Sequence, residues 1–340
     1  MELFLLINYP FAWYKSKNVW IKGFFFDKDG QCYRNDELLE YFDGIIDEKD
    51  FYNRLNRING HFAVVVKSGE SCYVAVDRLR SLPMYICKDN DRIGVSDFAT
   101  TLRDKFGLTV LDEIGIEEIK QSGYTVGNRT AYQAISQLCA GEYAIISKGT
   151  FHVKHYYEHK HSDYVNLSKK QAFEILDDIS EKIYRRLISS VNGRQIVVPL
   201  SGGYDSRYIV AWLKRLGYRN VCCFTYGKAD SFEVEISRKV AKNIDFEWHF
   251  VEYTKDTWAS IFESEWTDFY DYAGQFSQCP HIQDIYAIYK LKKEKVIQED
   301  AVIVPGYCGD VLGGSFLIEK NMNNIDFSRE GLARYIYQIH

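Results

Sequence analysis

The chain has 340 residues, of which 46% are hydrophobic and 26% are charged, which is typical of a folded globular protein rather than a disordered one. A chain of this length is longer than a single hydrophobic core usually accommodates, so about two domains are expected. The net charge of −5 offers no basic field for a nucleic acid, and no apolar run approaches the roughly 18 residues that span a bilayer. Eight cysteines without a C-x-x-C pair, and a short amino-terminal apolar run without a basic flank, favour a cytoplasmic protein.

Residues 1–157 are predicted to form a mostly β, α+β domain. Short runs rich in β-branched and aromatic residues predict strands at Leu3–Ile7, Gly23–Phe26, Phe62–Val66, Cys72–Val76, Met84–Cys87, Arg92–Ser96, Gly141–Ser147 and Thr150–Tyr156. Helices are expected at Asp36–Phe42 and Leu111–Gln121. Closely spaced strands with few helices indicate antiparallel sheets packed face to face.

Residues 158–340 have the pattern of an α/β domain. After a polar linker at 158–166, Ser168 is expected to cap a long amphipathic helix that ends near Val191. Strands are then predicted at Gln195–Leu200, Val221–Tyr226, Glu247–Val251 and Ala301–Val304, with helices at Ser206–Leu216, Ser231–Asn243 and Ile282–Lys295. Short apolar strands between helices predict a parallel, doubly wound sheet.

The run S-G-G-Y-D-S at 201–206 joins a predicted buried strand directly to a predicted helix. A helix N-terminus at the carboxyl end of a parallel strand presents unpaired N–H groups to an anion, and two glycines let the backbone approach phosphate closely. Asp205 would repel phosphate, so its useful role is to hold Mg²⁺. A simple Gly-Gly turn capped by Ser201 is the alternative.

A second acidic loop, P-G-Y-C-G-D at 305–310, follows another predicted buried strand. Ligands of open α/β sheets bind beyond the carboxyl ends of the strands, so Asp310 is expected to complete a two-carboxylate Mg²⁺ site with Asp205. The alternative is a turn in which Asp310 caps the next segment.

These two loops resemble those of the asparagine synthetase superfamily, whose carboxyl-terminal domains are PP-loop ATP pyrophosphatases. The resemblance implies an ATP-binding domain at 158–340 with catalytic and metal-binding roles for Asp205 and Asp310. It further implies that ATP is bound by Leu200, Ser201, Gly202, Gly203, Asp205, Ser206, Tyr226 and Gly306. Glu233 falls where the family often has an acidic residue.

Residues 59–65, 76–85 and 130–143 resemble strands of the family's glutaminase domain, an Ntn-hydrolase-like sandwich. That domain uses a cysteine at the processed amino terminus, whereas here Met1 is followed by Glu2, so glutamine hydrolysis by that mechanism is not expected. Tyr307 and Val311 stand where the family commonly has carboxylates. The chain stops at His340, where the family continues with a helical segment, so a homodimer or a partner that supplies this segment is a further hypothesis.

The activity implied by the resemblance is an AMP-forming ligase that adenylates a carboxylate, aspartate by default, and transfers ammonia or an amine to it. Two alternatives stay open: a nucleotide-binding scaffold without turnover, and an amide ligase for a peptide, antibiotic or sugar. Arg207 is interpreted equally as a phosphate contact, a substrate contact or a helix-surface residue.

Overall fold

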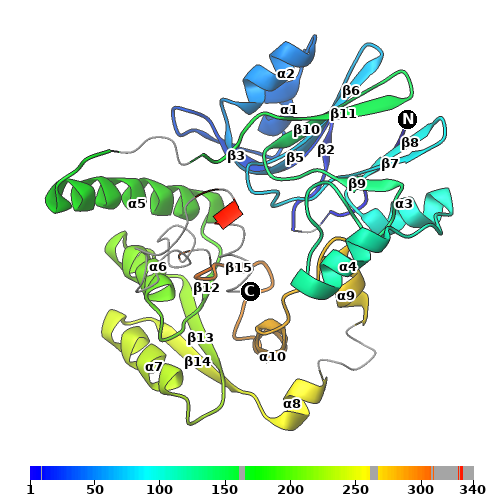
Figure 1. Ribbon diagram of the computed structural model, residues 1–340. Helices are drawn as coiled ribbons and strands as arrows, with labels where there is room; N and C mark the ends of the chain where they lie inside the picture. Colours follow the sequence, from blue (N-terminus) through cyan, green and yellow to red (C-terminus); the bar gives the residue numbers. More distant parts are fainter. Residues whose placement is uncertain are drawn as a thin grey trace. The chain divides into compact units, whose positions relative to one another are not determined.

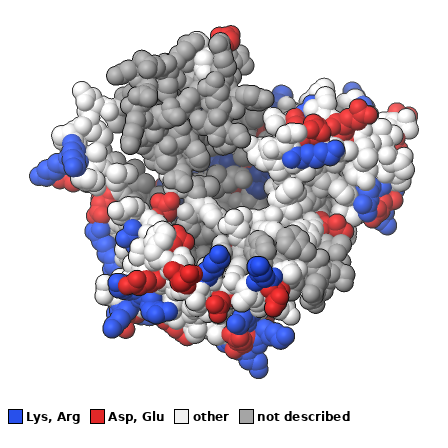
Figure 2. Space-filling view, turned by 60° about the horizontal axis from the view of Figure 1, so that its bottom comes forward, with Lys and Arg blue, Asp and Glu red and all other residues white. Residues whose placement is uncertain are grey.

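The computed structural model describes residues 1–8, 10–160, 165–260, 267–307, 309, 328, 330 and 331 (Figure 1). The chain divides into two compact units: unit 1 is Met1–Ser190 with Lys255–Tyr286, and unit 2 is Val191–Thr254 with Ala287–His340. The segments 158–190 and 255–286 therefore belong to unit 1. The boundary that the sequence predicts between residues 157 and 158 concerns the two domains of the resembled family, and it stays a prediction. On the face shown in Figure 2, acidic and basic side chains are interspersed over the part that the structure describes.

Unit 1 contains a seven-stranded antiparallel sheet and a second sheet of four strands. The first has the order β11-β10-β6-β5-β3-β2, with β4 paired to β3. Its strands are β2 (Tyr14–Lys15), β3 (Val19–Phe26), β4 (Cys32–Arg34), β5 (Asn59–Ser68), β6 (Ser71–Val76), β10 (Glu142–Ser147) and β11 (Thr150–His155). The second has the order β1-β8-β7-β9, with β1 (Glu2–Phe4), β7 (Tyr85–Asp89), β8 (Arg92–Ser96) and β9 (Ile135–Gln137).

One strand pair of unit 1 departs from the predicted antiparallel arrangement: β1 pairs with β8 in parallel, with Leu3 opposite Val95. The predicted strand Leu3–Ile7 also ends early, at Phe4. The backbone N–H groups of Leu6 and Ile7 instead donate to the Asp97 carboxylate, at 2.9 and 3.1 Å. The Asp97 side chain thus accepts the hydrogen bonds that a neighbouring strand would accept if β1 continued.

The helices of this part of the chain follow the expected pattern only in part. They are α1 (Glu37–Phe42), α2 (Glu48–Leu55), α3 (Ala99–Phe106), α4 (Glu113–Ser122), α5 (Lys169–Val191), α8 (Lys255–Ser260) and α9 (Thr267–Gly274). Helices α2, α3, α8 and α9 were not expected. The signal for α2 is present, because the Asp47 side chain accepts a hydrogen bond from Asp50 N, and Phe51 and Leu55 bury one face.

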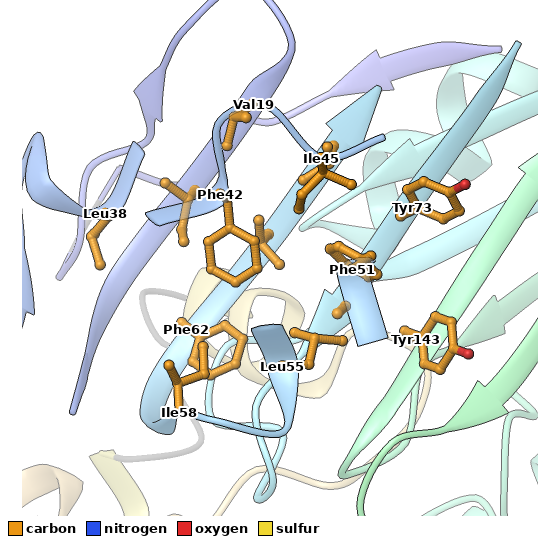
Figure 3. Packing of buried hydrophobic residues seen from close by; sticks show 14 of the residues in the cluster. Val19, Leu38, Phe42, Ile45, Phe51, Leu55, Ile58, Phe62, Tyr73 and Tyr143 are labelled. Atoms are coloured by element: carbon orange, nitrogen blue, oxygen red, sulfur yellow. The ribbon is translucent and has the colours of Figure 1, made fainter. Parts of the chain in front are cut away.

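Two hydrophobic clusters cover the two faces of the seven-stranded sheet. One is formed by β3, β5, β6 and β10 against α1 and α2, with Phe42, Phe51 and Phe62 fully buried (Figure 3). The other joins β5, β6 and β10 to β7 and β8, through side chains such as Val65 and Ile86. Period-2 alternation along each strand supplies both faces, as expected for two sheets packed face to face.

Unit 2 is built on a parallel sheet with the order β14-β13-β12-β15. Its strands are β12 (Ile196–Pro199), β13 (Val221–Gly227), β14 (Glu247–Glu252) and β15 (Val302–Ile303), and its helices are α6 (Tyr204–Arg215), α7 (Phe232–Ile244) and α10 (Ile285–Lys293). The side chains of Val197, Val198, Cys222, Cys223 and Phe224 are fully buried. Mixed α/β architecture with an antiparallel and a parallel sheet is therefore confirmed, while the Ntn-hydrolase and PP-loop assignments stay predictions.

None of the helices in the described ranges combines the length and apolar character that crossing a bilayer would require.

Candidate functional site

The parallel sheet reverses its winding direction at β12. The chain moves from β12 to β13 and then β14 on one side, and β15 pairs with the other side of β12. Because β12 and β15 are parallel, the loops that follow them leave the same edge of the sheet. This edge is the topological switch point at which open α/β sheets bind ligands.

The first loop, at 201–206, is held by its own hydroxyl groups. Ser201 N donates to Ser206 Oγ at 3.1 Å, Gly203 N donates to Ser201 Oγ at 3.1 Å, and the two serine oxygens lie 3.2 Å apart. Both hydroxyls therefore shape the loop. Gly203 is the N-cap of α6, so the first N–H groups of this helix have no acceptor within the helix.

The second loop passes directly against the first. A Cβ placed on Gly306 would lie 2.8 Å from Ser206 N, and one placed on Gly309 would lie 2.3 Å from Asp205 Oδ2. A side chain at 306 would collide with the backbone of Ser206, so the close approach of the two loops requires glycine there, whereas a side chain at 309 would displace the Asp205 carboxylate. The Asp205 carboxylate thus faces the backbone that immediately precedes Asp310. Asp310 itself, like Cys308 and Val311, lies outside the described residues.

Thr225 fixes the start of the first loop, a role that sequence reasoning missed. Its hydroxyl lies 2.6 Å from Leu200 O, 2.7 Å from Ser237 Oγ on α7 and 3.0 Å from Trp248 Nε1 on β14. Leu200 N also donates to Phe224 O at 2.7 Å. The sign of this role in the sequence is a single threonine within an otherwise apolar strand.

The remaining predicted site residues lie around this edge. Tyr226 is at the carboxyl end of β13, and its ring stacks on Tyr253 with centroids 5.1 Å apart. Glu233 packs against Gly202, because a Cβ on that glycine would lie 3.5 Å from Glu233 Cγ. Arg207 lies along the surface of α6, where Nε donates to Gly203 O at 2.9 Å and the guanidinium covers the ring of Tyr204. Of the three interpretations of Arg207, the helix-surface one matches these contacts.

The arrangement fits a polyphosphate nucleotide with a divalent cation. The loop at 201–206 offers helix N-terminal N–H groups beside two glycines, Gly202 and Gly203, and Asp205 is exposed beside them. Backbone donors suit phosphate oxygens, and a carboxylate suits Mg²⁺. Asp205 is the described residue that would hold such an ion.

A second site lies entirely within unit 1. A cavity of about 780 Å³ is lined by Lys22, Arg80, Asp97 and Gln137, among others. Lys22 Nζ lies 2.8 Å from Asp97 Oδ2, and both side chains are almost fully buried. Burial lowers the pKa of Lys22 more than its ion pair with Asp97 raises it. This buried ion pair was not expected from the sequence, although a single lysine within the apolar run 19–26 was its visible sign.

Two family models match the chain, and together they assign it to the ATP-dependent amidotransferases and ligases. Residues 49–157 match the family model described as glutamine amidotransferase domain, and residues 175–318 match the model described as asparagine synthase. With both domains present in this order, the chain belongs to the asparagine synthetase superfamily.

No curated protein matches the sequence. Among solved structures, an NH3-dependent NAD synthetase from Campylobacter jejuni aligns over 51% of this chain and 74% of its own, with 12% identity and a TM-score of 0.27. A glutamine phosphoribosylpyrophosphate amidotransferase from B. subtilis aligns over 76% of this chain and 53% of its own, with 12% identity and a TM-score of 0.25. An allosteric regulatory enzyme of purine biosynthesis aligns over 87% of this chain and 62% of its own, with 11% identity and a TM-score of 0.27. Similarity as weak as this does not assign a fold or a function to the chain.

Proposed function

We propose that this protein is an AMP-forming amide ligase that adenylates a carboxylate with ATP and joins it to ammonia or an amine. The observation that carries the proposal is the contact of two loops at the switch point, where Gly309 brings the second loop onto the carboxylate of Asp205. The family assignment supports the use of ATP, and the loop supplies a place for its phosphates.

The reaction proposed here solves a leaving-group problem. A carboxylate does not react with an amine near neutral pH, because its oxygen leaves poorly. In the first step a carboxylate oxygen bonds to the α-phosphorus of ATP, and the bond from that phosphorus to pyrophosphate breaks. In the second step the amine bonds to the acyl carbon, AMP leaves with the electron pair of the broken C–O bond, and a proton goes to solvent.

The described residues contribute mainly by positioning charge. The N–H groups at the start of α6 would stabilise negative charge on phosphate oxygens, and the hydrogen bonds of Ser201 and Ser206 within the loop hold these groups in position. Asp205 would hold Mg²⁺, which when bound neutralises charge on the departing pyrophosphate. Asp310 stays the proposed second ligand. Tyr226, at the neighbouring strand end, is the proposed contact for the adenine ring.

Replacing Asp205 with asparagine tests the proposal. Pyrophosphate release from ATP-Mg²⁺ is measured with the purified protein over a panel of carboxylates that begins with aspartate, and the D205N variant should show no release. Asp245→Asn is the matched control, because Asp245 is an exposed aspartate at the opposite end of α7, with φ of 57°, a conformation that asparagine also adopts. Unchanged release in D205N would remove Asp205 from the site.

A scaffold that binds nucleotide without turnover is the second candidate, favoured by the exposed Tyr307, which takes a position where the family commonly has a carboxylate. Saturable ATP-Mg²⁺ binding with no pyrophosphate release for any carboxylate would support the scaffold and contradict the ligase.

We further propose that free ammonia or an amine, and not glutamine, supplies the nitrogen. Burial raises the pKa of the thiols of Cys72, Cys87, Cys139, Cys222 and Cys223, which keeps them protonated and poorly nucleophilic near neutral pH. Incubation with glutamine should give no glutamate, while ammonium should support amide formation. Steady glutamate production would overturn this part of the proposal.

A further inference from the structure

Three side chains of types that can ligate a metal ion meet at the amino ends of β13 and β14, away from the loops described above. Cys222 and Glu247 are directly opposite each other in the parallel pair, and His249 follows Glu247 by two residues. Side chains two positions apart on a strand point to the same face, so all three lie on one face of the sheet.

The ligand atoms of these residues, one each from Cys222, Glu247 and His249, all lie within 4.8 Å of one another. His249 Nε2 is 2.7 Å from Glu247 Oε1. Cys222 is fully buried, whereas the side chains of His249 and Glu247 are 30% and 60% exposed. The cluster is therefore a buried thiol beneath two ligands that reach solvent.

A surface ion pair accounts for the histidine and the glutamate but not for the thiol beneath them. Without a cation, a carboxylate and a thiol gain little from this proximity. A divalent cation makes the same three groups mutually favourable, because it binds the thiolate, the carboxylate and the imidazole together.

The ligand types select the metal. Thiolate and imidazole suit Zn²⁺, whereas Mg²⁺ and Ca²⁺ prefer oxygen ligands. Zinc–ligand bonds of about 2.0–2.3 Å place tetrahedral ligand atoms about 3.3–3.8 Å apart, so only small side-chain movements are needed. Three protein ligands leave the fourth position to water.

We propose that Cys222, Glu247 and His249 form a Zn²⁺ site that joins β14 to β13. On binding, a sulfur–zinc bond forms and the thiol proton passes to solvent. The site is separate from the proposed nucleotide site, because Cys222 precedes Tyr226, the proposed adenine contact, by four residues on the same strand, about 13 Å along it.

Cobalt binding by the full-length protein tests the proposal, because Co²⁺ substitutes for Zn²⁺ and reports a thiolate ligand by charge-transfer absorption. Metal-free protein should bind one equivalent of Co²⁺ with this absorption, and Zn²⁺ should displace it. Cys222→Ser should abolish the absorption. Glu247→Gln and His249→Gln, which alter partly exposed side chains and should not impair folding, should each weaken binding at least about tenfold.

Matched controls separate this site from other thiols and from the nucleotide site. Cys223→Ser changes the adjacent buried thiol, which points to the opposite face, and Cys279→Ser changes an exposed one, so both should keep the absorption. D205N should bind Co²⁺ normally even if it releases no pyrophosphate. Absence of a thiolate band in the parent protein, or a band that survives Cys222→Ser, or unchanged affinity in both Glu247→Gln and His249→Gln, would overturn the zinc site and leave the ligase proposal intact.

Discussion

Asp97 is the residue on which the end of β1 and one wall of the unit 1 cavity both depend. Besides the two backbone donors of Leu6 and Ile7, its carboxylate accepts hydrogen bonds from Trp13 Nε1 and Lys22 Nζ, each at 2.8 Å. The centroid of the Trp13 ring also lies 4.8 Å from Lys22 Nζ. A fully buried carboxylate with this many donors is well compensated, whereas the lysine depends on one strong partner.

The Lys22–Asp97 pair predicts an asymmetric response to mutation. Asp97→Asn should lower the free energy of unfolding by about 3–5 kcal/mol, because it leaves a buried ammonium group without its anion. Lys22→Met should cost less, because Asp97 keeps its donors from Leu6, Ile7 and Trp13. Urea unfolding of both variants measures the difference. Equal losses, or a larger loss for Lys22→Met, would contradict the inference that the buried lysine depends on Asp97 more than Asp97 depends on the lysine.

At the scale of elements, the hydroxyl of Thr225 connects β13 to the end of β12, to α7 and to β14. The position of the first loop therefore depends on a side chain that lies 25 residues beyond Leu200 along the chain. Thr225→Val should lower the free energy of unfolding by about 1–3 kcal/mol, because Leu200 O and Trp248 Nε1 lose a buried partner at nearly constant volume. It should also reduce pyrophosphate release by loosening the loop.

Thr225→Ser is the matched control, since serine keeps the hydroxyl and loses only a methyl group. It should retain most of the stability and activity that Thr225→Val loses. A serine variant as impaired as the valine variant would assign the effect to packing of the methyl group, and the hydrogen bonds would then not be what positions the loop.

The elements that the sequence predicted are those with a strong local pattern. The strand–loop–helix at 196–215 could be predicted because apolar strand, glycines and amphipathic helix follow in order. The parallel pairing of β1 with β8 could not, because it joins residues about ninety positions apart and no local pattern encodes it. The proximity of Gly309 to Asp205 and the contacts of Thr225 are likewise products of tertiary packing.

Both units bury thiols whose pKa is raised by desolvation. The pKa is about 11 for Cys87 and Cys139 and about 12 for Cys72, Cys222 and Cys223, against an ordinary value of 9.0. In the metal-free protein, a raised pKa in the folded state means that the folded chain keeps these thiol protons at pH values where the unfolded chain releases them. The resulting stability is complete below pH 9 and is lost as the pH rises through the window between 9 and 12.

The free energy of unfolding should therefore fall steadily above about pH 9, by up to about 1.4 kcal/mol per pH unit for each thiol. Urea unfolding in the presence of a reductant, at a series of pH values between about 8 and 10.5, measures this slope. Added salt should change it little, because the cause is desolvation rather than surface charge. Cys87→Ala should make the slope shallower, whereas Cys279→Ser, at an exposed position, should not. A flat profile, or equal slopes in the two variants, would show that the buried thiols do not govern the alkaline stability of this protein.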